Sequence, residues 1–156
     1  MISAMSPDVI DFVKKIKLGF VSSVLPDGKP HLSHKGTLTV YDDQHLIFAD
    51  IASPQTVENI VHHSEVVIEV VDFLSRKGFR FIGKAKVTSV SDPSSSPYIS
   101  FYESWGLQDV TSRVKNFVLI KVESVQETFS PAYSWGASEP ELRTRWTSYY
   151  TNLWKF

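Results

Sequence analysis

Residues 20–50 read FVSSVLPDGKPHLSHKGTLTVYDDQHLIFAD, and this stretch decides the fold. Two turn signals, Pro26-Asp27-Gly28-Lys29 and Asp42-Asp43-Gln44, interrupt segments that favour extended structure. The spacing therefore predicts three strands, over residues 20–25, 30–41 and 45–50. Strands joined by such short turns pair with their neighbours in the chain, so the sequence predicts an antiparallel meander.

Downstream of Asp50, the chain adds a short helix and three further strands. Ser53-Pro54 combines a capping residue with a first-position proline and predicts a helix over 56–63. The β-branched run over 66–73 predicts a strand buried on both faces, whereas the alternation over 79–87 predicts a longer strand with one wet face. The last predicted strand spans 117–125.

Helices are predicted at both ends of the chain. Ser6 and Pro7 open a helix that Gly19 ends, and another short helix covers 98–107. The helix opened by Pro140 carries five large side chains on one face: Leu142, Trp146, Tyr149, Tyr150 and Leu153. A face of this size must be covered, either as a dimer interface or as an outer lid on its own subunit.

The number of strands and the placement of the helices indicate the fold class. About six strands with a few short helices, none placed as regular βα crossovers, predict a mainly β fold, a closed six-stranded antiparallel barrel with peripheral helices. A length of 156 residues is that of one domain. We divide it into an N-terminal helix over 1–18, the barrel over 19–125 and a C-terminal extension with a helix over 126–156.

The composition excludes several classes of protein. Lys and Arg number 16 against 17 Asp and Glu, so a net charge of −1 offers no electrostatic footprint for nucleic acid. No apolar run reaches the roughly 18 residues of a membrane span. The absence of cysteine excludes disulfides, thiolate metal sites and a cysteine nucleophile. It fits a reducing, cytoplasmic setting, and the alternative is a secreted protein without cysteine.

Short catalytic motifs are missing from the sequence, which has no GxGxxG, GxxxxGK, HExxH or GxSxG. His62 and His63 are adjacent and cannot face one metal ion from one helix. His31 and His34 lie three apart on one predicted strand and so point to opposite faces. No metal site is expected, and the sequence identifies no general acid or base.

Two segments suit an anion. Ser33-His34-Lys35-Gly36-Thr37 offers a cation, hydroxyls and a glycine that permits close backbone approach. Ser53-Pro54-Gln55-Thr56 opens a helix whose free N–H groups suit a phosphate, and Asn59 follows one turn later. The alternative interpretation makes Ser53 only a helix cap and Lys35 only a solvated strand lysine.

Taken in order, these motifs resemble the FMN-binding split barrels related to pyridoxamine 5'-phosphate oxidase. The resemblance is carried by the segments 23–31, 33–36, 48–50, 53–60, 78–85, 117–125 and 130–133. It covers roughly residues 8–136. It implies a six-stranded split barrel that forms a homodimer, with two FMN sites in the groove between the subunits.

The resemblance also implies which residues contact the flavin. The phosphate and ribityl chain would be approached by His34, Lys35, Gly36 and Thr37. Backbone at the edge of the ring would come from Phe48, Ala49 and Asp50. The phosphate end would be completed by Ser53, Gln55, Thr56 and Asn59. The partner subunit would contribute Lys77 and Gly78.

The implied function is that of an FMN-dependent oxidoreductase acting on a small molecule. The oxidases proper carry basic residues at the positions of His34 and Gln55, and their C-terminal pattern that grips pyridoxal phosphate has no match here. Pyridoxamine phosphate is therefore not the expected substrate. The alternatives are a deazaflavin or haem enzyme on the same barrel, and a non-enzymatic module that binds such a ligand.

Overall fold

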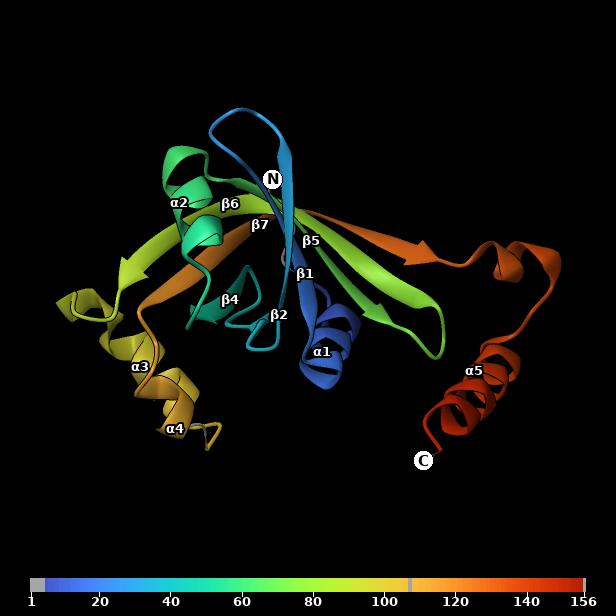
Figure 1. Cartoon of the computed structure of the whole chain (residues 1–156). Helices are drawn as coiled ribbons and strands as arrows, with labels where there is room; N and C mark the ends of the chain where they lie inside the picture. The colour runs from blue at the N-terminus through green and yellow to red at the C-terminus, as the bar shows by residue number, and fades with distance from the viewer. Residues whose placement is uncertain (1–4, 107, 156) are drawn as a thin grey trace.

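A turn over residues 26–29 joins the first two strands of a seven-stranded antiparallel sheet, β1 (Gly19–Val24) and β2 (Pro30–Lys35). The computed structural model describes residues 5–106 and 108–155. The other strands are β3 (Thr39–Val40), β4 (His45–Asp50), β5 (Glu65–Asp72), β6 (Lys77–Ser89) and β7 (Asn116–Phe129). Their order is β2-β1-β5-β6-β7-β4-β3, and the sheet curls into a half-barrel (Figure 1).

The predicted mainly β split barrel is confirmed, but the strand predicted over 30–41 is not continuous. The chain turns after Lys35, where the Leu38 N–H donates to the Lys35 carbonyl over 3.4 Å. At this turn the Thr37 hydroxyl bonds both the N–H and the carbonyl of Ala49 over 3.0 Å, in place of ladder bonds. The break raises the strand count from six to seven. Among the described residues no ladder joins β2 to β3, so the predicted closed barrel is an open, curled sheet.

The described residues form five α-helices: α1 (Pro7–Ile16), α2 (Pro54–His62), α3 (Ser96–Glu103), α4 (Gln108–Thr111) and α5 (Glu139–Leu153). The predicted Ser6 cap is confirmed, because its hydroxyl accepts a hydrogen bond from the Val9 N–H. The predicted stop at Gly19 is wrong. Lys17 takes the left-handed C-cap position with φ 56°, and Gly19 begins β1.

The main hydrophobic core lies on the inner face of the sheet, against α1. Within β5, Val66, Ile68 and Val70 are buried in this core, whereas Val67 is 38% exposed on the other face. The prediction that this strand is buried on both faces is therefore wrong. Its β-branched residues reflect the preference of a pleated strand, which holds on either face.

The last strand runs four residues past its predicted end, to Phe129, because β6 continues to pair with it. Their ladder runs from Lys77 opposite Phe129 to Ser89 opposite Asn116, with a register shift at Ile82/Gly83. This ladder carries α5 to the end of the sheet opposite α2 and α3 (Figure 1). The long pair of strands thus separates two parts of the molecule.

The C-terminal extension packs against the turn between β5 and β6 of its own chain. Arg143 Nη2 donates to Asp72 Oδ2 over 2.7 Å and forms an ion pair with it. The Arg76 guanidinium lies 3.8 Å from the centre of the Trp146 ring. A short 3₁₀ segment, Pro131–Trp135, precedes α5. These charged and aromatic contacts hold α5 against the turn between β5 and β6.

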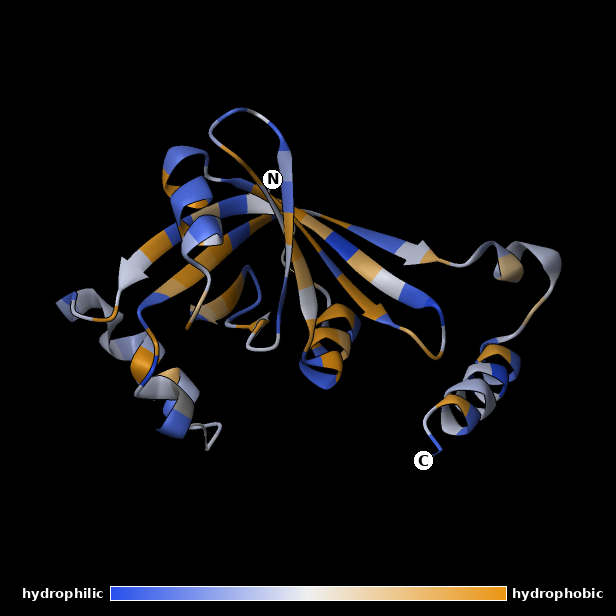
Figure 2. Cartoon of the chain, in the orientation of Figure 1, coloured by the Kyte–Doolittle hydropathy of each residue, from blue (hydrophilic) through white to orange (hydrophobic). Residues whose placement is uncertain are grey.

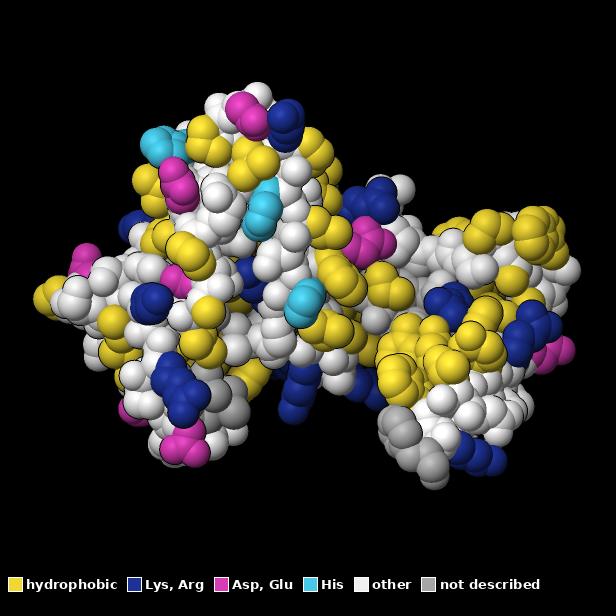
Figure 3. Space-filling view, in the orientation of Figure 1, with side chains coloured by type: hydrophobic (Ala, Val, Ile, Leu, Met, Phe, Trp, Pro, Cys, Tyr) yellow, Lys and Arg dark blue, Asp and Glu magenta, His cyan; other side chains and the backbone are white. Residues whose placement is uncertain are grey.

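Much of the apolar face predicted for the C-terminal helix stays exposed. Leu142 is buried and Trp146 and Tyr150 are partly buried, but Tyr149 and Leu153 are about half exposed. Trp154, which follows the helix, is 65% exposed. Figure 2 shows apolar residues concentrated on α1 and the strands, while α5 is mainly pale or blue. Figure 3 shows hydrophobic side chains gathered on the visible surface of the α5 region, whereas Lys and Arg side chains are scattered over the molecule.

Candidate functional site

The predicted anion site centres on Lys35, the last residue of β2. Alternation along β2 turns Ser33 and Lys35 to the same inner face, and only 5% of Lys35 is exposed. Its Nζ donates to the hydroxyls of Ser33 (2.8 Å), Ser53 (2.6 Å) and Thr56 (3.3 Å). The fold therefore gathers β2 and the first turn of α2 around one ammonium group.

The hydrogen-bond acceptors of this ammonium group are all neutral hydroxyl oxygens. Burial lowers the pKa of Lys35, and the negative charge of Asp50 acts in the opposite direction. Over the described part of the chain, no carboxylate forms an ion pair with Lys35. The Phe48 ring centroid lies 5.6 Å from Nζ. Because buried charges are normally paired, a buried cation among hydroxyls is suited to an anion.

Ser53 has a different role from the simple helix cap of the alternative interpretation. It occupies the N-cap position of α2, but its side chain makes no cap hydrogen bond and instead accepts from Lys35. Its N–H donates to Asp50 Oδ1 over 2.8 Å, and Asp50 Oδ2 accepts from Asn116 Nδ2 over 2.8 Å. Asp50 therefore orients the start of α2 and leaves the Ser53 hydroxyl to the lysine.

The predicted amide residues of α2 bond to the protein itself. Asn59 is fully buried, its Nδ2 donates to Ser23 Oγ over 3.0 Å, and its Oδ1 accepts from Gln55 Nε2 over 2.8 Å. These bonds fasten α2 to β1. Gln55 is only partly buried and lies at the outer end of this chain of bonds.

Thr37 and Ala49 also lie together, through the pair of hydrogen bonds that interrupts β2 and β3. The Thr37 carbonyl accepts a further bond of 2.8 Å from the buried hydroxyl of Tyr102. Gly36 is exposed, and a Cβ built on it would meet no atom within 4 Å. His34 is exposed and lies opposite Phe20, on the face of β2 away from Lys35.

Within one chain, Lys77 and Gly78 lie apart from the other predicted flavin-binding residues. They begin β6 at the end of the sheet that carries α5 (Figure 1). Lys77 Nζ pairs with Glu139 over 3.1 Å. A Cβ on Gly78 would lie 2.4 Å from the Val70 carbonyl oxygen, so close packing of β5 against β6 alone requires glycine there.

Sequence reasoning named Ser33 in the anion segment but did not assign it to the flavin site, and it missed Ser23. The spacing of two between Ser33 and Lys35 places both side chains on one face, and this signal could have assigned Ser33. Ser23 could not have been found, because it meets Asn59 across 36 residues of sequence. His31 lies on the same face as Ser33, and its buried Nδ1 has no hydrogen-bond partner within the described residues.

Metal-ligating side chains do not cluster in the part of the chain that the structure describes. Within residues 5–106 and 108–155, no group of three or more His, Asp or Glu side chains is placed to hold a metal ion. None of the described helices is long and apolar enough to cross a bilayer. The arrangement around Lys35 therefore suits the binding of an anion, and it identifies no acid or base.

Comparison with protein families gives one match. The model described as Pyridoxamine 5'-phosphate oxidase matches residues 5–129, which is more than half of the chain. No curated protein matches the sequence significantly. The matched region includes Lys35 and the three hydroxyl residues bonded to it, Ser33, Ser53 and Thr56, which together form the Lys35 cluster. It ends before α5.

Solved structures share the fold. HupZ of Group A Streptococcus is 24% identical, with 81% of this chain and 95% of that chain covered and a TM-score of 0.68. A putative pyridoxamine 5'-phosphate oxidase from Lactobacillus delbrueckii is 22% identical, with 79% and 93% covered and a TM-score of 0.66. An FMN-binding protein from Syntrophomonas wolfei is 12% identical, with 76% and 82% covered and a TM-score of 0.60.

Neighbours at similar distances carry names that point to other cofactors. An F420 reductase is 15% identical with a TM-score of 0.59, and covers 78% of this chain and 98% of its own. HutZ, the heme storage protein from Vibrio cholerae, is 16% identical with a TM-score of 0.62, and covers 82% and 98%. At these identities the likeness establishes the fold alone.

Proposed function

The chain belongs to the pyridoxamine 5'-phosphate oxidase family, and from this membership we propose that it is a homodimeric FMN-binding flavoprotein with oxidoreductase activity. Its substrate is a small molecule. The proposal places the protein in the cytoplasm, which its cysteine-free composition permits.

The observation that carries the proposal is the buried ammonium group of Lys35 on three hydroxyls. A phosphate monoester fits this set, because it would supply the missing negative charge and accept from the three hydroxyls, whose own protons are free. The ammonium would give up one of its three hydroxyl partners for a phosphate oxygen. Lys35 would bind the phosphate of FMN, with Ser53 and Thr56 beside it. The N–H groups in the first turn of α2 add a favourable dipole.

The remaining residues orient the cofactor. Asn59 and Asp50 hold the start of α2 in place through Ser23, Ser53 and Asn116. The turn at Gly36 leaves backbone accessible beside the phosphate end. When bound, FMN would supply the electron transfer that the side chains cannot. No residue is assigned as a proton donor or acceptor.

The dimer is part of the proposal because the residues implied to bind FMN lie at two separate ends of the sheet in one chain. In one chain, Lys77 and Gly78 lie at the end of the sheet away from α2 (Figure 1). A second subunit could bring its own copies of these residues to the Lys35 cluster. Lys77 would then have to exchange its bond with Glu139 for one with the cofactor, or bind both.

Identification of the bound chromophore tests the proposal. The full chain is purified, its absorption spectrum is recorded, and any cofactor is extracted and identified by mass. Flavin bands, or stoichiometric uptake of added FMN, support the proposal. A Soret band or an extracted deazaflavin favours the cofactors named for HutZ and the F420 reductase. A colourless protein that ignores FMN contradicts the proposal and favours a module for another ligand.

A further inference from the structure

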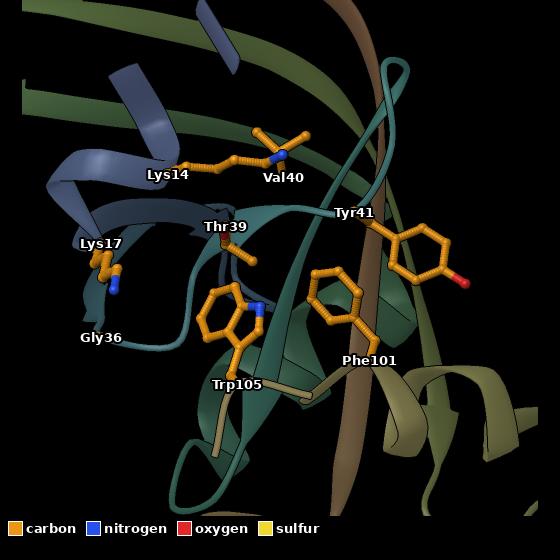
Figure 4. A pocket seen from close by; sticks show the side chains of 8 residues that line it. All are labelled: Lys14, Lys17, Gly36, Thr39, Val40, Tyr41, Phe101 and Trp105. Atoms are coloured by element: carbon orange, nitrogen blue, oxygen red, sulfur yellow. The ribbon is translucent and has the colours of Figure 1, made fainter. Parts of the chain in front are cut away.

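Two cavities border α1. One, of about 570 Å³, lies between the C-terminal end of α1, Gly36 and the rings of Phe101 and Trp105 (Figure 4). Gly36 is also one of the residues assigned to the flavin. The other cavity, of about 600 Å³, lies between α1, the turn that joins β5 to β6, and the start of α5. Among the residues that the structure describes, the two cavities share no lining residue, so the second is a separate space.

The second cavity includes a part of the chain that the family match leaves out. Glu139 and Arg143 of α5 form one side of it, whereas the match ends at residue 129. Figure 1 shows α1 and α5 on the same side of the long strands β6 and β7. Lys77 and Gly78 also border the cavity, and the Lys77 ammonium is bonded there to Glu139 over 3.1 Å. The C-terminal extension and the sheet therefore set its chemistry together.

One wall of this cavity is aromatic. Phe12 of α1 and Phe79 of β6 have ring centroids 5.1 Å apart, in an edge-to-face arrangement. Both rings are only partly buried, and Val9 and Ile16 continue the apolar surface along α1. The face of an aromatic ring attracts a positive charge as well as apolar groups. This wall therefore suits a ligand with an apolar body and a cationic group.

Four charged side chains at the α5 end of the cavity neutralise one another. Arg143 Nη2 lies 2.7 Å from Asp72 Oδ2 and 3.1 Å from Glu139 Oε1. Lys77 Nζ lies 3.1 Å from the second carboxylate oxygen of Glu139. Two cations and two carboxylates sum to zero, and each group already has a partner of opposite charge. This network therefore adds no net charge to the cavity.

Three further charged side chains line the cavity: Asp8 and Lys15 of α1, and Glu127 of β7. All three are exposed, and none forms an ion pair within the described residues. Asp8, Phe12 and Lys15 follow one stripe of α1, and Glu127 lies opposite Phe79 in the ladder of β6 and β7. Two unpaired carboxylates against one ammonium leave an excess of negative charge beside the aromatic wall.

We propose that this second cavity binds a small organic cation, an amine that carries an apolar or aromatic body. Asp8 and Glu127 receive its positive charge, and its body packs against the rings of Phe12 and Phe79. The cavity thus selects for charge with the carboxylates and for shape with the rings. The inference does not rest on the proposed flavin chemistry, because neither carboxylate is assigned to the cofactor.

The test uses two probes of the same size that differ in charge. Phenethylamine is a cation at neutral pH, and phenethyl alcohol has the same aromatic ring and chain with a neutral hydroxyl. Each is titrated into the isotope-labelled full chain, and the amide chemical shifts give both the affinity and the place of binding. The amine is expected to bind about fivefold tighter than the alcohol, with shifts in α1, the β5–β6 turn and the start of α5. Equal affinities, or shifts concentrated at the cavity of Figure 4, overturn the proposal.

Paired variants assign the charge. Asp8→Asn with Glu127→Gln should weaken amine binding about fivefold and leave the alcohol unchanged. The control, Asp11→Asn with Glu58→Gln, makes the same change in charge on exposed carboxylates outside the cavity and should have no effect. Lys15→Gln removes the opposing positive charge and should tighten amine binding about twofold. Unchanged amine affinity in the first variant, or weaker binding after Lys15→Gln, would make the proposal wrong.

Flavin titration separates this cavity from the proposed cofactor site. The variant Asp8→Asn with Glu127→Gln should bind FMN with wild-type affinity, and saturating phenethylamine should leave the FMN affinity unchanged. If the variant loses FMN binding, or if the amine and FMN exclude each other, the cavity belongs to the flavin site and the inference of a separate site is wrong. A wild-type chain that binds the amine but no FMN would contradict the proposed function and leave this inference standing.

Discussion

The Lys35 ammonium donates a 2.6 Å hydrogen bond to the Ser53 hydroxyl and so joins the end of β2 to the start of α2. The bond uses the side chain that would otherwise cap the helix. Lys35 and Ser53 are thereby held close together, where a bound phosphate could contact both side chains. The first two predictions follow from this relationship.

Lys35→Ala should weaken FMN binding about tenfold to a hundredfold, because a hydrogen bond to a charged group contributes about 1.5–3 kcal/mol. Titration of the apo-protein by flavin fluorescence measures the change. Lys29→Ala provides the control, since Lys29 is an exposed lysine of the hairpin that leads to β2. An unchanged affinity for Lys35→Ala would show that this lysine has only a structural role.

The stability of the apo-protein should depend on pH through Lys35. Burial lowers the pKa of this residue, with Asp50 opposing the effect, so between the lowered pKa and the ordinary lysine value the unfolded chain binds more protons than the folded chain. Wild-type stability therefore gains from Lys35 as pH rises through this window. Lys35→Met lacks this gain, so its melting temperature should fall relative to wild type as pH rises. A difference that does not change with pH would contradict the prediction.

Thr39→Val should raise the melting temperature of the ligand-free protein. The buried Thr39 hydroxyl has no partner within the described residues, and valine replaces it with a methyl group of the same size. Removing an unsatisfied buried hydroxyl should stabilise the chain by about 1 kcal/mol, or roughly 2–4 °C for a protein of this length. Differential scanning calorimetry measures the shift. A lower melting temperature would mean that the hydroxyl is satisfied in solution.

The docking of α5 should weaken in acid. Burial alone would raise the pKa of Asp72, but hydrogen bonds from Arg143, the Leu74 N–H and Ser75 outweigh it and hold the pKa below the ordinary value. A carboxyl of this kind stabilises the fold above its unfolded pKa, and the contribution is lost as pH falls through the folded pKa. Asp72→Asn should therefore melt below wild type at neutral pH.

The pH dependence of this difference checks its origin. The gap in melting temperature between wild type and Asp72→Asn should close as pH falls below about 4, the ordinary range of aspartate. Asp109→Asn is a control at an exposed carboxyl of α4. A gap that persists in acid would mean that the Asp72 charge does not stabilise α5.

The sequence predicted those parts of the fold that depend on local signals. The strand over 45–50 and the Ser6 cap were predicted correctly, because alternation and capping residues act over a few positions. The break of the second strand was missed, since it depends on Thr37 bonding to Ala49, twelve residues away. The end of α1 was misplaced because Lys17 adopts a backbone conformation that glycine usually supplies.

The candidate site was predictable only through the order of its motifs. Lys35, Ser53 and Thr56 are separated by 18 and 21 residues, and no local pattern shows that they meet. The family resemblance placed them together, and the structure supplies the hydrogen bonds. The pairing of Lys77 with Glu139, 62 residues away, lies partly outside the region that carries the resemblance and could not be foreseen.

The full chain should be a homodimer that α5 helps to close. Leu153 is 54% exposed and Trp154 is 65% exposed, and a second subunit that covered them would gain the free energy of burying large apolar side chains, about 1.5–3 kcal/mol each. Sedimentation of the full chain at low micromolar concentration should give a dimer. The chain truncated after Ser138 should give a monomer with a folded sheet, which circular dichroism checks.

The outcomes of this last experiment separate the two roles of α5. A truncated chain that stays dimeric and loses only thermal stability would make α5 a lid, held on its own subunit through Asp72 and Arg143. A full-length monomer that still binds FMN stoichiometrically would contradict the proposed dimer. It would show that FMN binding does not need Lys77 and Gly78 from a second subunit. Loss of both dimer and FMN binding on truncation, with the sheet still folded, is the result that we expect.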